Sequence, residues 1–203
     1  MDRTTSIRIL VFIAPIIAIA CLGSSCEQRS TKDQNVSHTM DFFKRMADGK
    51  RWTSGNLNVN TVPSYCYENA EQNCRRYGHL YTWESARRAC QSLGDGWRLP
   101  AEDEWRQLAK HYGGVHEDAD DGGKAAYKAL LAGGGSGFNA VLGGGRSTDG
   151  QFARLEAHGF YWTASESDPG SAWFYNFGQG STSLYRQRAG EKQMAVSVRC
   201  VRD

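Results

Sequence analysis

Six cysteines carry most of the chemistry that the sequence can predict, and they form two groups. Two of them, Cys21 and Cys26, follow an apolar N-terminal segment. The other four are Cys66, Cys74, Cys90 and Cys200. An even number of cysteines in an exported chain predicts disulfides, and four cysteines allow three different pairings. Because no Cys-x-x-Cys spacing occurs, we do not expect these four thiols to bind a metal ion.

The N-terminal segment indicates export. Arg3 and Arg8 precede the apolar residues 9–20, whose twelve residues would rise only about 18 Å as a helix. This length is too short for a bilayer core of about 30 Å and is typical of a secretory signal. The small residues before Cys21 and Cys26 resemble the lipobox of bacterial lipoproteins, in which the cysteine thiol is acylated.

The number of cysteines bears on which of the two thiols is lipidated. If Cys26 is acylated, an even four remain, whereas acylation of Cys21 leaves Cys26 unpaired. We therefore expect Cys26 to be the lipidated residue, with Cys21 as the alternative. Residues 1–25 are then the signal peptide. Residues 26–39, which contain a single aliphatic side chain, are a flexible tether, and residues 40–203 are the folded domain.

No pattern of catalytic or metal-binding residues emerges from the rest of the chain. The five histidines are scattered, and Gly-x-Ser-x-Gly, phosphate-binding and dinucleotide-binding motifs are absent. The acidic residues 117–121 partly match a calcium loop, but its twelfth position would be Ala129 instead of glutamate. We predict no cofactor and no metal, and weak calcium binding by this loop stays open.

Composition supports a globular domain without nucleic-acid binding. Lys and Arg number 24 and Asp and Glu 22, so the net charge is +2 and gives no general attraction to nucleic acid. Hydrophobic residues make up 40% of the chain and charged residues 23%, as in folded proteins. Of the 23 glycines, twelve lie within residues 113–150, which predicts long glycine-rich loops there.

Local patterns predict helices in the first half of the domain and strands in the second, which indicates the α+β class. Helices are expected at 40–47, 83–93, from Pro100 to 112, and at 124–131. Short strands are expected at 51–53, 56–59, 79–81 and 138–142, with a loop at 62–78. An antiparallel meander is expected from strands at 160–164, 172–177, 183–188 and 195–201.

Four ordered motifs give the chain a family resemblance. They are Tyr77-Gly-His-Leu-Tyr-Thr-Trp83, Gly96-Trp-Arg-Leu-Pro100 with Glu104-Trp105, Gly159-Phe-Tyr-Trp-Thr-Ala-Ser-Glu166, and Ser197-Val-Arg-Cys-Val-Arg-Asp203. Over residues 48–203 they resemble the Fibrobacter succinogenes major paralogous domain, which occurs in bacterial envelope proteins. That family is similar in fold to C-type lectin-like domains and formylglycine-generating enzymes. The resemblance implies a twisted antiparallel sheet, two main helices, and the pairings Cys90–Cys200 and Cys66–Cys74.

The same resemblance suggests two possible functions, formylglycine generation and non-catalytic ligand binding. Formylglycine generation needs reactive cysteines shortly before the last strand, and residues 184–194 contain none. The calcium signatures of sugar-binding lectins are also absent. We therefore expect a non-catalytic binding or adhesion domain for a glycan or an envelope protein, anchored by lipid at the outer membrane; the alternative is a divergent formylglycine-generating enzyme. The expected ligand-binding residues are Glu166, Ser167, Asp168, Asn176, Gln179, Tyr185 and Arg186.

Overall fold

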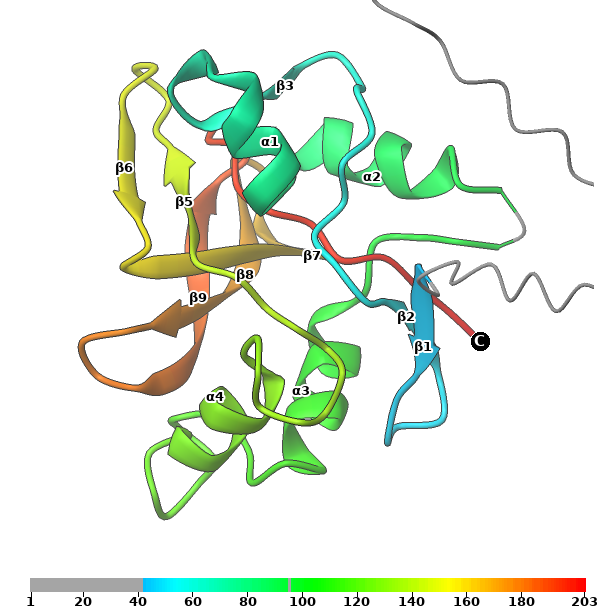
Figure 1. The fold of residues 1–203 in the computed structure, drawn as a ribbon, viewed down its shortest axis with the longest axis vertical. Helices are drawn as coiled ribbons and strands as arrows, with labels where there is room; N and C mark the ends of the chain where they lie inside the picture. The colour runs from blue at the N-terminus through cyan, green and yellow to red at the C-terminus, as the bar shows by residue number, and fades with distance from the viewer. Residues whose placement is uncertain (1–41, 95) are drawn as a thin grey trace, which may run out of the picture. The chain divides into compact units, whose positions relative to one another are not determined.

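The computed structural model describes residues 42–94 and 96–203 (Figure 1). The predicted signal peptide, the tether and the lipidated cysteine, Cys26 or Cys21, lie outside the described residues. The described residues form four α-helices and three β-sheets, so the α+β class is confirmed. None of the helices in this part of the chain is long and apolar enough to cross a membrane.

The largest sheet is mixed instead of purely antiparallel. Its strand order is β6 (Phe152–Leu155), β5 (Gly143–Arg146), β7 (His158–Asp168), β8 (Ser171–Gly178) and β9 (Ser183–Glu191). Strands β7, β8 and β9 form the predicted antiparallel meander. Strand β6 folds back along the outer edge of β5, so the chain enters β7 parallel to β5, with Gly144 opposite Gly159.

The prediction of a fourth strand of the meander at 195–201 is wrong. Within it, residues 195–197 make only isolated bridges, to Arg146, Tyr81 and Tyr161. The chain becomes a strand again at β10 (Val201–Arg202), which pairs with β2 (Arg51–Thr53) in a separate three-stranded sheet. Residues 195–197 therefore connect three elements that are far apart in the sequence, which no local pattern could indicate.

The helix predicted at 40–47 is also wrong where the structure describes that segment. Phe43–Arg45 is a strand, β1, which pairs with β2 around the turn at Asp48-Gly49. Gly49 in this turn adopts the positive φ of +81° that favours glycine. Pairing with β2 satisfies the backbone of this exposed segment, so tertiary contacts override its helical propensity.

Two further predicted strands are absent, because other parts of the fold satisfy their backbones. Residues 56–59 form no strand: the Leu57 N–H donates to Val198, and the Leu57 carbonyl accepts from His79. Residues 138–142 also form no strand, since the Tyr161 hydroxyl bonds both backbone groups of Val141, at 2.9 and 2.8 Å. The strand near this position is β5, which begins one residue later.

The predicted loop at 62–78 contains regular structure instead. Strand β3 (Ser64–Tyr65) pairs with β4 (Leu80–Tyr81), which agrees with the strand expected at 79–81. Between them lie a 3-10 turn, η1 (Tyr67–Asn69), and helix α1 (Glu71–Tyr77). The disulfide Cys66–Cys74, with a Cα separation of 4.9 Å, joins the start of this turn to the helix.

The other three helices lie where the sequence predicts them. Their buried faces pack into two separate hydrophobic cores. Helix α2 (Trp83–Gln91) packs against Trp162 on one face of β7 and is joined to the last segment by Cys90–Cys200. Helices α3 (Glu102–Lys110) and α4 (Lys124–Leu130) pack against Tyr161, Tyr175 and Phe177 on the other face. Because neighbouring strand residues point to opposite faces, β7 contributes to both cores.

Candidate functional site

The residues predicted to bind a ligand do not form one cluster. Glu166 and Asp168 lie where β7 meets β8, and Gln179 follows β8 at the opposite end of that hairpin. Asn176 and Tyr185 are cross-strand partners in the middle of the sheet. Arg186 lies on the other face of β9, toward α3. The seven residues, with Ser167 between Glu166 and Asp168, are therefore divided among four places.

Several of these side chains already have partners within the domain. Glu166 pairs with Lys192 at 2.7 Å, and the Asp168 carboxylate accepts the Gly170 N–H in the turn. The Ser167 hydroxyl donates to the Arg188 carbonyl. Arg186 donates to Glu102 at 3.0 Å and lies 5.0 Å from the centre of the Trp173 ring. These contacts give the four residues structural roles, whatever else they bind.

An apolar pocket opens where β5 and β7 diverge. Strand β5 pairs with β7 at Gly144, but its next partner is Ala195, to which Arg146 makes two backbone hydrogen bonds of 2.8 Å. Residues 195–197 bridge to both strands there, and a pocket of about 220 Å³ lies beside them. We name it the β5–β7 pocket. The residues that line it include Arg146, Ala153, Arg154, Phe160, Phe174 and Met194.

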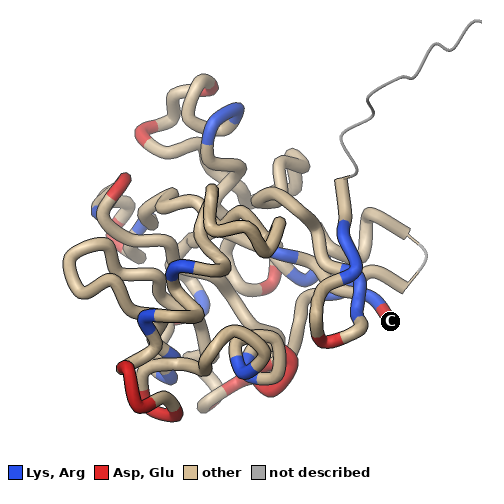
Figure 2. The backbone as a smooth tube through the Cα atoms, turned by 60° about the horizontal axis from the view of Figure 1, so that its bottom comes forward, with Lys and Arg blue, Asp and Glu red and all other residues tan. Residues whose placement is uncertain are grey.

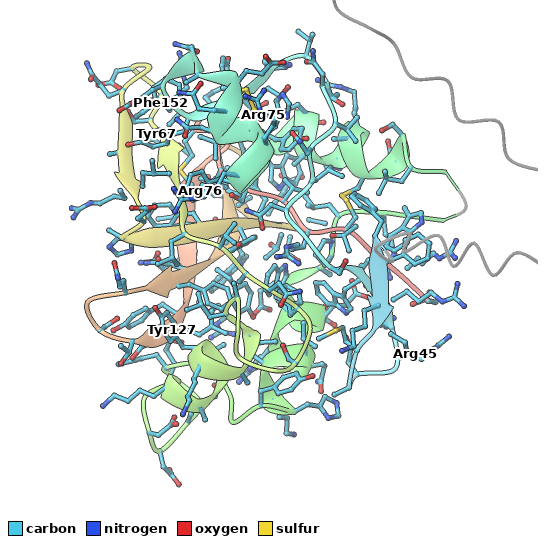
Figure 3. The ribbon with its side chains drawn as sticks, viewed as in Figure 1. Arg45, Tyr67, Arg75, Arg76, Tyr127 and Phe152 are labelled. Carbon is cyan, nitrogen blue, oxygen red and sulfur yellow. A yellow bond between two sulfur atoms is a disulfide. The ribbon has the colours of Figure 1, made fainter. Side chains whose placement is uncertain are left out.

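Arg146 is held in place at the rim of this pocket. Its guanidinium carbon lies 4.2 Å from the centre of the Tyr65 ring and 5.8 Å from that of Phe152. Tyr67 packs on Phe152 from the other side, at a ring distance of 5.2 Å (Figure 3). Among the described residues no carboxylate forms an ion pair with Arg146 or Arg154. Cation–π contacts orient such a side chain without neutralising its charge.

Two of the predicted residues lie beside the pocket. Phe160, Asn176 and Tyr185 are opposite one another on three adjacent strands, so they share a face of the sheet. His158 stacks on Phe160 at 5.3 Å and contacts the Asn176 amide oxygen through Nδ1 at 2.9 Å. Tyr185 stacks on His116 at 4.7 Å. This row continues the aromatic surface of the pocket with groups that can form hydrogen bonds.

The sequence did not indicate the pocket itself. Large apolar side chains occur on both faces of β7 and β8, and the sequence does not show which of them are buried. Tyr161, Trp162 and Tyr175 are fully buried, whereas Phe160 and Phe174 are only partly buried. The only sequence signal for the pocket is that β7 and β8 contain many aromatic residues. Which of these residues reach the surface depends on where β5 diverges from β7.

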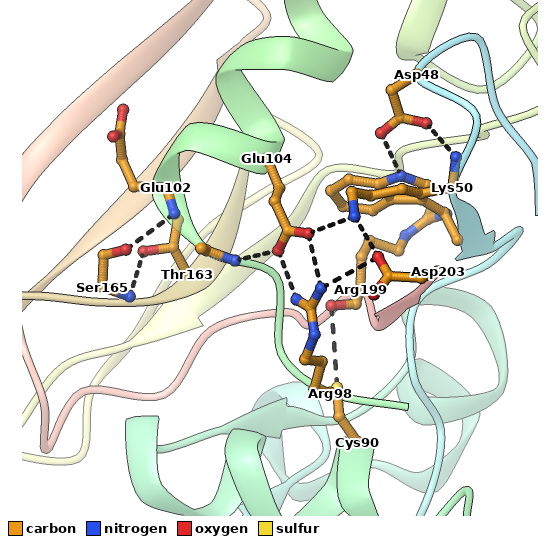
Figure 4. Close-up of polar contacts among 12 residues, drawn as sticks. Asp48, Lys50, Cys90, Arg98, Glu102, Glu104, Thr163, Ser165, Arg199 and Asp203 are labelled. Carbon is orange, nitrogen blue, oxygen red and sulfur yellow. Dashed lines mark hydrogen bonds and ion pairs between the residues drawn. The ribbon is translucent and has the colours of Figure 1, made fainter. Parts of the chain in front are cut away.

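A network of charged groups forms the densest titratable cluster, shown in Figure 4. The Glu104 carboxylate accepts two hydrogen bonds from Arg98, at 2.5 and 2.8 Å, and one from the Ala101 N–H at 2.9 Å. Lys50 lies 3.2 Å from Glu104 and also pairs with Asp203. Burial alone would raise the pKa of Glu104, but these partners outweigh it and lower the pKa to about 2.

This charged network has a structural role. It borders a polar pocket of about 550 Å³ that also contains Asp103 and His111. Because Glu104 stays ionised at neutral pH and is bonded by Arg98, Lys50 and a backbone N–H, it is poorly suited to proton transfer. The network instead ties the start of α3 to β2 and to the last residue, Asp203.

The acidic loop and the cysteines likewise have internal partners. Arg106 donates to both oxygens of Asp118, at 2.6 and 2.8 Å, and Asp121 accepts three N–H groups at the start of α4. The one group of possible metal ligands in the described part of the chain is Cys66, Cys74 and His79. Its two sulfurs are joined in a disulfide and are therefore not thiolates.

The motif residues have structural positions in this geometry. Arg98 and Glu104 form the charged network, Trp105 fills the core, and Cys200 closes the long disulfide. Comparison with known families matches residues 33–202 to the Fibrobacter succinogenes major domain. The chain belongs to that family. A search of curated proteins finds no match. Membership in the Fibrobacter succinogenes major domain family thus accounts for the residues that build the fold, and the ligand must be inferred from the pocket.

Proposed function

We propose that this chain is a lipid-anchored protein of the bacterial cell envelope whose domain binds a ligand without catalysing a reaction. In this proposal Cys26 carries the anchor at the outer membrane, and the α+β domain is a C-type lectin-like scaffold. The ligand binds across the β5–β7 pocket and the adjoining row of Phe160, Asn176 and Tyr185.

One observation supports this proposal above the others: an apolar pocket lies beside an arginine that aromatic rings orient and that forms no ion pair with a described carboxylate. Phe160, Phe174 and Met194 offer apolar surface, and Arg146 offers hydrogen-bond donors next to it. Ligand sites typically combine a mainly apolar cavity with a few fixed polar groups. The pocket suits an apolar side chain of an envelope protein with a carboxylate or carbonyl nearby, more than it suits a polar sugar.

The alternative of a formylglycine-generating enzyme has no observation in its favour. That chemistry needs reactive thiols, and all four cysteines among the described residues are in disulfides. The charged groups around Glu104 are bonded to one another, as described above. A binding function therefore agrees better with the side chains that remain available.

The test is binding of the purified full chain to arrays of envelope peptides and of glycans. Ala153 is an exposed residue of β6 that lines the pocket, so Ala153→Trp places an indole in it without disturbing a core. We expect this change to weaken binding by at least about tenfold, or about 1.4 kcal/mol.

The matched control is Ala189→Trp, which adds the same side chain at an exposed position of β9 outside the pocket. It should bind like the unmodified protein, and both variants should unfold at similar temperatures. Equal binding by all three proteins would contradict the proposed site, and a preference for glycans over peptides would change the ligand class. Turnover of a bound compound would contradict the non-catalytic function.

A further inference from the structure

Three arginines lie side by side in the three-stranded sheet. Arg45 of β1 is directly opposite Arg51 of β2, and Arg51 is directly opposite Arg202 of β10. Directly opposite residues of paired strands point to the same face, about 5 Å apart. Like charges in this arrangement are destabilising unless something outside the sheet compensates them.

Asp48 and Asp203, which flank the strands of this sheet in the sequence, already have partners. Asp48 accepts from the Trp52 indole at 2.8 Å and from the Lys50 N–H at 3.0 Å. Asp203 pairs with Lys50 and lies 3.6 Å from Arg98. Arg45 donates to the Gly49 carbonyl, and neither Arg45 nor Arg51 has a carboxylate partner among the described residues. Arg45 and Arg51 therefore place two positive charges on this face without a described carboxylate partner, and Lys and Arg positions lie beside the C-terminus in Figure 2.

Exposed aromatic rings accompany these arginines. Phe42 and Phe43 are 43% and 40% exposed, and only Val62 joins them among the exposed large hydrophobic residues of the described part. Phe43 packs on Trp97 at 5.4 Å, and the Arg202 guanidinium lies 5.6 Å from the Phe43 ring. Cationic side chains next to exposed apolar rings are the combination that binds the interface of an anionic bilayer.

The position in the chain favours a membrane over a soluble anion. Phe42 follows the predicted lipidated Cys26 by sixteen residues, and sixteen residues span at most about 58 Å even when fully extended, so the proposed anchor keeps this face near the membrane. We propose that the face formed by Phe42, Phe43, Arg45, Arg51 and Arg202, named here the arginine face, docks on the phosphate-bearing headgroups of the anchoring membrane. This proposal rests on the proposed lipid anchor and is independent of the β5–β7 pocket.

The test uses the full lipidated chain reconstituted into vesicles, with hydroxyl-radical labelling read residue by residue. One vesicle preparation contains phosphatidylcholine alone and the other a third phosphatidylglycerol. We expect labelling of Phe42 and Phe43 to fall in the anionic vesicles and to recover in 1 M salt, where the screening length is only about 3 Å. Labelling of Tyr185, on the five-stranded sheet, should not change.

Charge removal provides the second measurement. Arg45→Gln with Arg51→Gln should lower the ratio of docked to undocked protein by about fivefold for each arginine, or about 25-fold together. The matched control is Arg75→Gln with Arg76→Gln, two exposed arginines on α1, away from Arg45 in Figure 3. This control should dock like the unmodified chain, and unfolding temperatures would show that all variants are folded.

Two results would overturn the proposal. One is equal labelling of Phe42 and Phe43 in both kinds of vesicle. The other is equal protection by soluble inositol hexaphosphate in phosphatidylcholine vesicles, which would show an anion site that does not need a membrane surface. Neither result bears on peptide binding at the β5–β7 pocket, so the two proposals can fail separately.

Discussion

Two arginines of this domain lie in two different regions. Arg199 is inside the core, and Arg146 is at the rim of the β5–β7 pocket. Arg199 is fully buried and donates to the carbonyls of Thr53, Phe138 and Asn139, at 2.8, 2.5 and 2.7 Å. It also donates to the Asn56 side chain at 3.1 Å. Burial lowers the pKa of Arg199 to about 10, so the guanidinium remains charged at neutral pH.

Arg146 has the opposite setting. It is partly exposed and lies against two aromatic rings, and it interacts electrostatically with Asp149 without forming an ion pair with any described carboxylate. The comparison teaches that an arginine whose hydrogen bonds go to buried backbone carbonyls and to the Asn56 side chain holds segments together. An arginine that is oriented by rings but keeps its donors is available for recognition. The predictions below test this division, beginning with the largest expected effect.

Replacing Arg199 should be the most damaging of these changes. Arg199→Met keeps apolar bulk but removes the donors to the carbonyls of Thr53, Phe138 and Asn139. We expect a loss of about 3–5 kcal/mol in the free energy of unfolding, measured by urea denaturation with the disulfides intact. Arg199→Lys keeps the charge but has fewer donors. Its free energy of unfolding should lie between those of the unmodified chain and Arg199→Met. A loss below about 1 kcal/mol would contradict the structural role of Arg199.

The charged network around Glu104 predicts a specific acid sensitivity. The pKa of Glu104 is about 2 in the folded protein, against 4.5 for a free carboxyl group, so the ionised form of Glu104 stabilises the fold. This stabilisation is fully present above about pH 5 and is lost as the pH falls through 2. We expect it to amount to about 2–3 kcal/mol.

The measurement is denaturant unfolding at pH 7 and pH 3, compared between the unmodified chain and Glu104→Gln. The variant should be less stable at pH 7 and should lose less stability on acidification. Parallel pH profiles for the two proteins would show that other carboxyl groups cause the acid sensitivity. Asp118, which pairs with Arg106 away from this network, provides the matched control as Asp118→Asn.

Replacing Arg146 should have the smallest effect on stability. Its side chain contributes cation–π contacts at a partly exposed site, so Arg146→Gln should cost less than about 1 kcal/mol of unfolding free energy. The same change should weaken peptide binding in the array described above. A loss comparable to that of Arg199→Met would make Arg146 a structural residue and remove the contrast between the two sites.

The parts of the fold that were predicted correctly depend on nearby residues. The buried faces of α2 and α3 repeat at helical spacing, and β7, β8 and β9 are joined by short turns, so local patterns identified them. The pairing of Cys90 with Cys200 came from the family resemblance, because spacing alone left three pairings open.

The parts that were missed depend on contacts between distant residues. Phe43 is in a strand because β2 lies beside it, and helix α1 lies inside a segment that the sequence describes only as rich in polar and aromatic residues. Phe160 and Phe174 reach a pocket because β5 separates from β7. Arg146 matters there because Tyr65, some eighty residues earlier, supplies the ring on which it lies. No local pattern contains this information.

The place of residues 195–202 has a consequence for how the protein is made. These residues bridge to β4, β5 and β7 and pair with β2, and they are synthesised after all of these partners. Both cores contain residues of this last segment, so neither is complete until synthesis of the chain is nearly finished. Until Cys200 is synthesised, the other cysteines of the described residues that Cys90 can meet are Cys66 and Cys74. Early closure of Cys66–Cys74, only eight residues apart, would protect Cys90 from a wrong pairing while the chain is being completed.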